Sequence, residues 1–262
     1  MTEPPVLSLR DLRFGYDAAG PDTLRGISLD IPGGAVTAVL GANGAGKTTL
    51  LHVVLGLLSP QGGEVWIAGR RQTDRTRQES SRLVAMVPQN EHIPFDLSVL
   101  EYVLMGRSPH IATLGMPGRA DYEIAVESIG ALGLQHLSHR PVPELSGGER
   151  QLVALARALA QHAPILLLDE PAAHLDLGNT RRLLSLIDML AKRGSTVVFT
   201  SHDPSVAASV ADNVVLMRDG RVLKAGTTQS IFTSEYLTLT YGVPVRVRTV
   251  EGIQVVLPEH TA

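Results

Sequence analysis

Eight consecutive residues, 41 to 48, have the types and the spacing of a loop that binds phosphate. They read G-A-N-G-A-G-K-T and fit the pattern G-x-x-x-x-G-K-[ST]. Glycines let the backbone wrap closely around an anion, with its N–H groups pointing inward. Lys47 adds a positive charge for the outer phosphates, and the Thr48 hydroxyl can ligate Mg²⁺. The residues that we expect to bind a nucleotide here are Gly41, Asn43, Gly44, Ala45, Gly46, Lys47, Thr48 and Thr49.

The sequence on either side of this loop supports the prediction. Residues 36–40 form an apolar run that is typical of a strand. Residues 47–58 predict a buried helix, which is apolar on nearly all sides apart from His52. Because strand, loop and helix in this order form the phosphate-binding unit, the context argues against a glycine-rich turn with an accidental lysine.

Two carboxylates, Asp169 and Glu170, follow the apolar run 165–168, which is typical of a strand buried on both faces of a parallel sheet. Ligands of open parallel sheets bind at the carboxyl ends of the strands, so we expect both side chains beside the phosphate loop. Asp169 suits the shell of a Mg²⁺ ion, and Glu170 can accept a proton from an attacking water. An ordinary exposed Asp-Glu pair is the alternative, and the upstream loop disfavours it.

Residues 146–149, S-G-G-E, predict a second anion site. Ser146 and Glu149 have the spacing of a capping box that opens a helix over 149–161. The two glycines between them leave N–H groups approachable, as a site for an anion at a helix N-terminus requires. Since the chain already has a phosphate loop, this second site suggests a second molecule.

Several segments resemble, in chain order, the motifs of the ATP-binding cassette (ABC) ATPases. The pentapeptide 145–149, L-S-G-G-E, resembles the signature sequence of that family. Tyr16 resembles the aromatic residue that stacks on adenine, and Gln89 resembles the glutamine that links the Mg²⁺ site to the helical lobe. Asp169-Glu170 resemble the second acidic motif of the family. Residues 174–176 resemble the segment at the dimer interface, and residues 201–203 resemble the segment of the switch histidine.

This resemblance implies a head-to-tail dimer around two ATP molecules, in which loop 41–48 of one subunit faces residues 146–149 of the other. It implies that Glu170 activates the water and that His202 contacts the γ-phosphate. The catalytic residues that it implies are Glu170, His202, Gln89 and Lys47. The Mg²⁺ ligands that we expect are Thr48, Gln89 and Asp169. The further nucleotide-binding residues that the resemblance implies are Tyr16, Ser146, Gly147, Gly148, Glu149 and Asp176.

The chain of 262 residues is long enough for one large domain or two small ones, and we expect a single domain over 1–262. The predicted fold class is α/β: a P-loop NTPase (RecA-like) core with an N-terminal antiparallel β-subdomain and an inserted α-helical subdomain. The core covers about 1–89 and 162–262, and the helical subdomain covers about 90–161. Strands are predicted at 6–14, 26–31, 36–40, 64–67, 84–87, 165–168, 196–199, 213–217, 221–224, 245–249 and 253–257, and helices at 47–58, from Ser98, at 121–132, 149–161 and 178–192.

Composition excludes several other classes of protein. The net charge is −3 with scattered basic residues, so we expect no nucleic acid as a partner. The chain has no cysteine, which excludes disulfides, thiol catalysis and cysteine-based zinc sites. The pair His136 and His139 has no neighbouring ligand residues and predicts no metal site. No apolar run approaches the roughly 20 residues of a membrane span, so we expect membrane attachment only through partners.

Three segments, 103–110, 171–177 and 241–245, resemble the importers of iron-siderophore, haem and vitamin B12. That resemblance implies a homodimer beneath two transmembrane permease subunits, a separate substrate-binding protein, and a place at the cytoplasmic face of the inner membrane. An importer of metal ions or molybdate is the alternative. An exporter subunit and a soluble ABC ATPase acting on ribosomes or DNA are less favoured, because no membrane helices, second cassette or coiled-coil insertion is present. Ala172-Ala173 departs from the hydroxyl residues of many cassettes.

Overall fold

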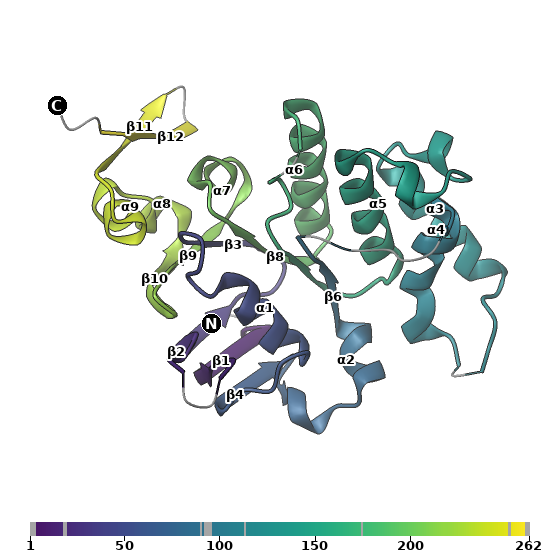
Figure 1. Ribbon diagram of the computed structural model, residues 1–262, viewed down its shortest axis with the longest axis horizontal. Coiled ribbons are helices and arrows are strands. Elements are labelled where there is room, and N and C mark those ends of the chain that lie inside the picture. The colour runs from purple at the N-terminus through teal and green to yellow at the C-terminus, as the bar shows by residue number, and fades with distance from the viewer. Residues whose placement is uncertain are drawn as a thin grey trace. The chain divides into compact units, whose positions relative to one another are not determined.

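The computed structural model in Figure 1 describes residues 4–17, 20–89, 91, 96–112, 114–173, 175–250 and 253–259. The chain divides into two compact units. The first unit comprises Met1–Arg75 and Ile187–Ala262, and the second comprises Thr76–Leu186. The predicted helical subdomain, 90–161, falls within the second unit, which also includes two strands that we assigned to the core. The predicted core and subdomain boundaries stay a prediction.

An antiparallel sheet in the first unit has the strand order β2-β1-β4-β5. Its strands are β1 (Leu7–Phe14), β2 (Leu24–Ile31), β4 (Gly62–Ile67) and β5 (Arg70–Arg71). Strands β1 and β2 pair antiparallel, with Leu9 opposite Leu29, as their alternating sequences predict. Buried and exposed residues alternate along β2, so one face of the sheet packs on the core.

A second group of strands in the first unit carries the phosphate loop. The strands β3 (Val36–Leu40), β8 (Thr196–Ser201), β9 (Asn213–Arg218) and β10 (Arg221–Thr227) lie in the order β10-β9-β3-β8. Strand β3 pairs parallel with both β8 and β9, and all of its residues are buried. The predicted hairpin of β9 and β10 turns at Asp219 and Gly220, which both have positive φ.

Helix α1 (Lys47–Leu55) follows the loop and ends three residues earlier than the predicted helix. The reason is Gly56, which adopts a left-handed conformation (φ 73°), while the N–H of Leu57 bonds back to the His52 carbonyl.

The remaining elements of this unit are η1 (Gln72–Asp74), α7 (Pro204–Val210), α8 (Thr228–Ile231), α9 (Ser234–Tyr241) and the hairpin β11 (Val245–Val250) and β12 (Ile253–Pro258). The helices α7, α8 and α9 were not predicted. The predicted turn of the tail hairpin, 251–252, lies outside the described residues.

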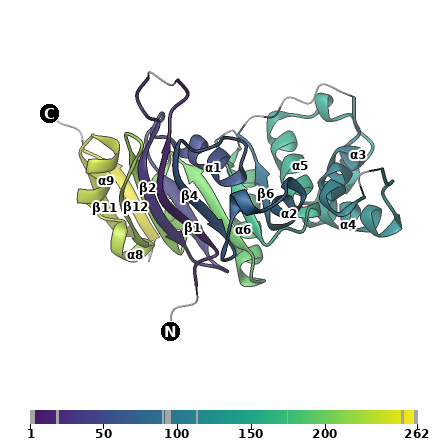
Figure 2. The ribbon, with the colours of Figure 1, turned by 90° about the horizontal axis from the view of Figure 1, so that it is seen from below.

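The second unit combines two parallel strands with a group of helices. The strands β6 (Val84–Val87) and β7 (Ile165–Leu168) pair in parallel. Its helices are α2 (Arg77–Leu83), α3 (Val99–Leu104), α4 (Arg119–Ala131), α5 (Gly147–Ala160) and the 3₁₀ turns η2 (Met105–His110), η3 (Gln135–Leu137) and η4 (Val142–Glu144). Helices α3, α4 and α5 pack side by side, as Figures 1 and 2 show. Helix α6 (Leu177–Lys192) begins in this unit and continues into the first.

Candidate nucleotide site

The phosphate loop connects β3 to α1 in the first unit, and its three glycines are each required for a physical reason. Gly44 (φ 81°) and Gly46 (φ 96°) are left-handed, a conformation that other residues rarely adopt. A Cβ at Gly41 would lie only 2.4 Å from the carbonyl oxygen of Met217, so no side chain fits there. The glycine pattern therefore encodes a tight backbone loop.

The first turn of α1 is arranged to hold an anion. Its N-cap is Gly46, which has no side chain that could accept a hydrogen bond from the N–H groups of the first turn. Lys47 is 6 % exposed, and its Nζ donates to the carbonyls of Gly41 (2.8 Å) and Ala42 (3.2 Å). The ammonium group thus lies on the loop itself, together with the positive end of the helix dipole.

Tyr16 lies against the start of α1. Its hydroxyl is 3.1 Å from Oγ1 of the buried Thr49, and its ring meets the edge of Phe14 with centroids 5.0 Å apart. The side chain is still 63 % exposed, which leaves ring surface for a base to stack on. Gln61 holds this turn with hydrogen bonds to the N–H and the carbonyl of Gly15, both at 3.1 Å. No local signal in the sequence identifies Gln61.

His202 follows directly on β8, and its exposed side chain lies at the same strand ends as the loop. In the parallel pairing of β3 and β8, Leu40 lies opposite Ser201, so Gly41 and His202 leave adjacent strands at their carboxyl ends. Asp203 then caps α7 by accepting from the N–H of Ser205 (2.8 Å). The first unit therefore brings the loop and His202 together, as the rule for open parallel sheets predicts.

In the second unit, Gln89, Asp169 and Glu170 follow the ends of adjacent strands. The N–H of Asp169 donates to the Val87 carbonyl at 2.9 Å, and Gln89 comes two residues after that carbonyl. Asp169 is 1 % exposed, and Glu170 is also buried. Glu170 has φ 47°, which is strained for a residue with a Cβ. Such strain is concentrated at functional sites, but nothing in the sequence predicts it.

The predicted capping box of α5 is confirmed. The Ser146 hydroxyl accepts from the Glu149 N–H (3.3 Å), and a Glu149 carboxylate oxygen accepts from the Ser146 N–H (2.8 Å). The Glu149 carboxylate is hydrogen-bonded by Ser146, by its side chain first and then by its backbone N–H, and these hydrogen bonds hold the pKa of Glu149 below its ordinary value. A Cβ built on Gly147 meets no atom within 4 Å, so the start of this helix is open to an approaching group.

The start of α6 lies beside this cap. A Cβ on Gly148 would lie 3.3 Å from Nδ2 of Asn179, and the Asn179 N–H donates to the carboxylate of Asp176 (2.7 Å). The structure thus places Asn179, which is hydrogen-bonded to Asp176, beside Gly148 of the cap. His174, which we placed in the same dimer-interface segment, lies outside the described residues.

The fold and the phosphate loop define an ATPase of the P-loop class, with the glycine-rich cap on a separate helix. The chain belongs to the ABC transporter family, because the sequence model of that family matches residues 24–173. It is an ATP-binding cassette that hydrolyses ATP to drive transport. None of the described helices has both the length and the apolar character of a membrane span.

Relatives of known description cover nearly the whole chain. The "Hemin import ATP-binding protein HmuV" of Gloeobacter violaceus is 40 % identical over 242 residues, which are 90 % of this chain and 87 % of that protein. The "Molybdate import ATP-binding protein MolC" of Haemophilus influenzae is 39 % identical, over 92 % of this chain and 89 % of its own.

Solved structures agree in fold. A transporter described as of metal-chelate type, in an inward-facing conformation, is 36 % identical, with a TM-score of 0.83 and coverage of 97 % of this chain and 98 % of its own. A dimeric bacterial ABC transporter cassette has a TM-score of 0.75 at 28 % identity, over 84 % of this chain and 98 % of its own. Cassettes of this family thus dimerise and associate in transporter complexes.

Proposed function

We propose that the chain is the ATPase subunit of an importer for metal chelates of the haem, iron-siderophore or cobalamin type. The observation that carries this proposal is the similarity, over 97 % of the chain, to a transporter of metal-chelate type. Import proteins for hemin (40 % identical) and cobalamin (38 %) support the same class. A "Probable iron chelatin transport ATP-binding protein" of Helicobacter pylori, at 36 %, does so as well.

The first unit binds ATP in this proposal. The N–H groups at the start of α1, the loop backbone and Lys47 hold the phosphates, because they gather positive charge in one tight turn. Tyr16 stacks on the base with its exposed ring, and its hydroxyl contact with Thr49 orients that ring. His202 contacts the γ-phosphate from the neighbouring strand end.

A Mg²⁺ ion fits the chemistry of the proposed ligands. Thr48, Gln89 and Asp169 offer hydroxyl, amide and carboxylate oxygens, which are the hard donors that Mg²⁺ prefers. The burial of Asp169 at a strand end is suited to a ligand of a metal rather than to a solvated surface charge. Bound by these residues, the ion would supply positive charge that offsets the negative charge of the phosphate oxygens during hydrolysis.

Glu170 is the proposed general base. Its carboxylate is buried on a strained backbone that fixes its direction, which is what a group that must take a proton from one water molecule needs. Gln89 and Lys47 complete the catalytic set. The glycine-rich cap, Ser146, Gly147, Gly148 and Glu149, together with Asp176, engages the ATP held by a second copy of the chain.

In the assembly that we propose, a homodimer of this subunit lies at the cytoplasmic face of the inner membrane beneath two permease subunits. A separate binding protein delivers the substrate. Molybdate import is the second candidate, and the relative at 39 % identity described as a molybdate importer favours it.

The test is transport by the subunit copurified with its permease and reconstituted into liposomes. We expect hemin, a ferric siderophore or cobalamin, presented with the binding protein, to stimulate ATP hydrolysis and to enter the vesicles. A complex carrying Glu170→Gln is the control and should transport nothing. If only molybdate stimulated ATP hydrolysis and entered the vesicles, the substrate class would be molybdate and not metal chelates. A complex that hydrolyses no ATP would refute the proposed function.

A further inference from the structure

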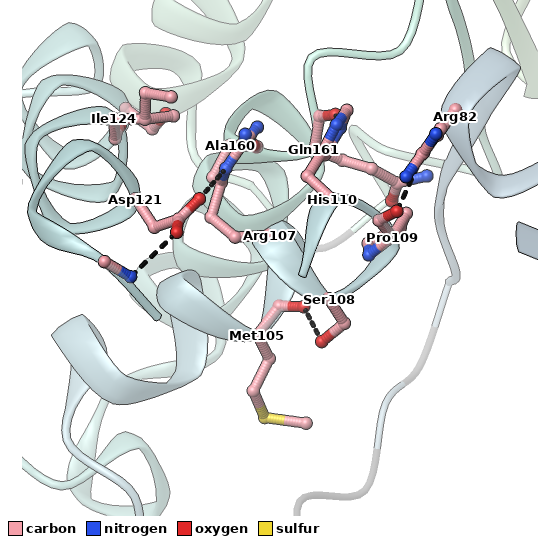
Figure 3. Close-up of polar contacts among 12 residues, drawn as sticks. Arg82, Met105, Arg107, Ser108, Pro109, His110, Asp121, Ile124, Ala160 and Gln161 are labelled. Atoms are coloured by element: carbon pink, nitrogen blue, oxygen red, sulfur yellow. Dashed lines mark hydrogen bonds and ion pairs between the residues drawn. The ribbon is translucent and has the colours of Figure 1, made fainter. Parts of the chain in front are cut away.

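The turn η2 is joined to the C-terminal end of α5, the helix that carries the glycine-rich cap at its other end. Figure 3 shows Arg107 between Asp121 and Ala160. Arg107 Nη1 donates to the Ala160 carbonyl (2.8 Å), and His110 Nε2 lies 2.8 Å from the Gln161 carbonyl. Because a carbonyl only accepts, Nε2 carries the proton. Two carbonyls at this helix end thus receive hydrogen bonds from one turn.

Arg107 is a buried ion-pair partner as well. Only 7 % of the residue is exposed, and its Nε lies 3.0 Å from Oδ1 of Asp121. The other oxygen of Asp121 accepts from the N–H of Gly118 (2.9 Å) at the start of α4. The Gly118 hydrogen bond first, and then Arg107, hold the pKa of Asp121 below its ordinary range, so the pair stays ionised. One guanidinium group therefore links the start of α4 to the end of α5.

The backbone of η2 approaches α5 closely. A Cβ on Gly106 would lie 2.2 Å from the carbonyl oxygen of Arg157, so only glycine fits at this contact. On the other side of the turn, the Pro109 carbonyl accepts from Arg82 Nε (2.8 Å). Gln161 Nε2 donates to the Val84 carbonyl (3.0 Å) at the start of β6, the strand that leads to Gln89. The end of α5 is thus fixed from several directions.

We propose that Arg107 is a positioning residue for ATP hydrolysis, which acts by holding α5 so that residues 146–149 meet the nucleotide of the second subunit. This inference rests on the proposed function of that cap. A helix of 14 residues is about 21 Å long at 1.5 Å per residue and moves as one body. A tilt of about 5° at the Ala160 end displaces the cap by roughly 2 Å. Displacements of about 1 Å can cost 100-fold in rate.

The test compares Arg107→Ala and Arg107→Lys with Arg119→Ala in the complex with the permease, using Mg²⁺-ATP. Arg119 is the matched control because it pairs with Glu123 on α4 but its side chain is 94 % exposed. For Arg107→Ala we expect kcat to fall about 10-fold or more and KM for ATP to stay within about 2-fold, since the phosphate loop is untouched. Arg107→Lys should recover part of kcat, because lysine keeps the positive charge but lacks the planar guanidinium group that donates to both Asp121 and Ala160. Arg119→Ala should match the parent.

The rates are divided by the folded fraction, measured by circular dichroism under the assay conditions. Parental kcat per folded molecule in both Arg107 variants would overturn the proposal, as would an equal fall in Arg119→Ala. If Arg107→Ala does not fold, Arg107→Lys and His110→Ala decide: a lowered kcat with unchanged KM supports the proposal, and parental kcat in both refutes it. An inactive parental complex would instead count against the proposed function, so the two failures are distinguishable.

Discussion

Gly147→Ala separates what this chain needs in order to fold from what it needs in order to act on a second nucleotide. Gly147 is the first residue of α5, and a Cβ there meets no atom within 4 Å. Within the described residues, the substitution therefore creates no clash. In the proposed dimer, however, the same Cβ stands where the phosphates held by the other subunit must approach.

The expected effects on stability and on activity have opposite signs. Alanine is favoured over glycine by about 0.8–1.0 kcal/mol inside a helix, and at a position in the first turn only part of this free-energy difference applies. The free energy of unfolding should thus rise by between zero and about 1 kcal/mol, which raises Tm by at most about 4 °C. Blocking hydrogen bonds to a reacting oxyanion costs about 100-fold or more in kcat.

The assay measures Tm by calorimetry, ATP affinity by equilibrium binding to the isolated subunit, and kcat by phosphate release. We expect Tm equal to or above that of the parent, unchanged ATP affinity and a kcat lowered at least about 100-fold. Gly130→Ala, in the last turn of α4, is the control, since its Cβ would only touch the flexible end of Gln135 (3.2 Å). If Gly147→Ala kept the parental kcat, the phosphates of the second subunit would not approach this helix end closely. If the variant had a lowered Tm, the space around Gly147 would not be open.

Two further substitutions test the nucleotide site of the first unit. Lys47→Ala removes the ammonium group that lies on the loop carbonyls. ATP affinity should fall about 10-fold or more, because a hydrogen bond to a charged group contributes about 1.5–3 kcal/mol. If a binding titration gave the variant the same ATP affinity as the parent, the role assigned to Lys47 would be excluded. Tyr16→Ala should weaken ATP binding by about 3- to 10-fold through loss of stacking, whereas Tyr16→Phe, which loses only the hydroxyl contact with Thr49, should bind nearly as the parent does. Equal affinity of Tyr16→Ala and the parent would place the base elsewhere.

The parts of the fold that could be predicted are those with a local physical cause. The strand β3, the glycine loop and the cap of α5 each follow from residues close together in the sequence, such as Ser146 and Glu149. The helix α1 was predicted three residues too long, because the apolar pattern continues to Leu58 while Gly56 ends the helix.

Other features depend on contacts that are remote in sequence, which is why they could not be predicted. Gln61 reaches the turn at Gly15 across 46 positions. Arg107 reaches Ala160 across 53. The left-handed conformation of Glu170 is imposed on a residue type that does not favour it, so no propensity could reveal it.

The central claim is that two copies of this chain enclose ATP and that Glu170 activates the water which hydrolyses it. Light scattering of purified Glu170→Gln after size-exclusion chromatography, with and without Mg²⁺-ATP, tests that claim most directly. We predict a monomer without nucleotide, a stable dimer with ATP, and hydrolysis nearly abolished. A variant that stays monomeric with bound ATP, or that turns over ATP at the parental rate, would contradict the claim.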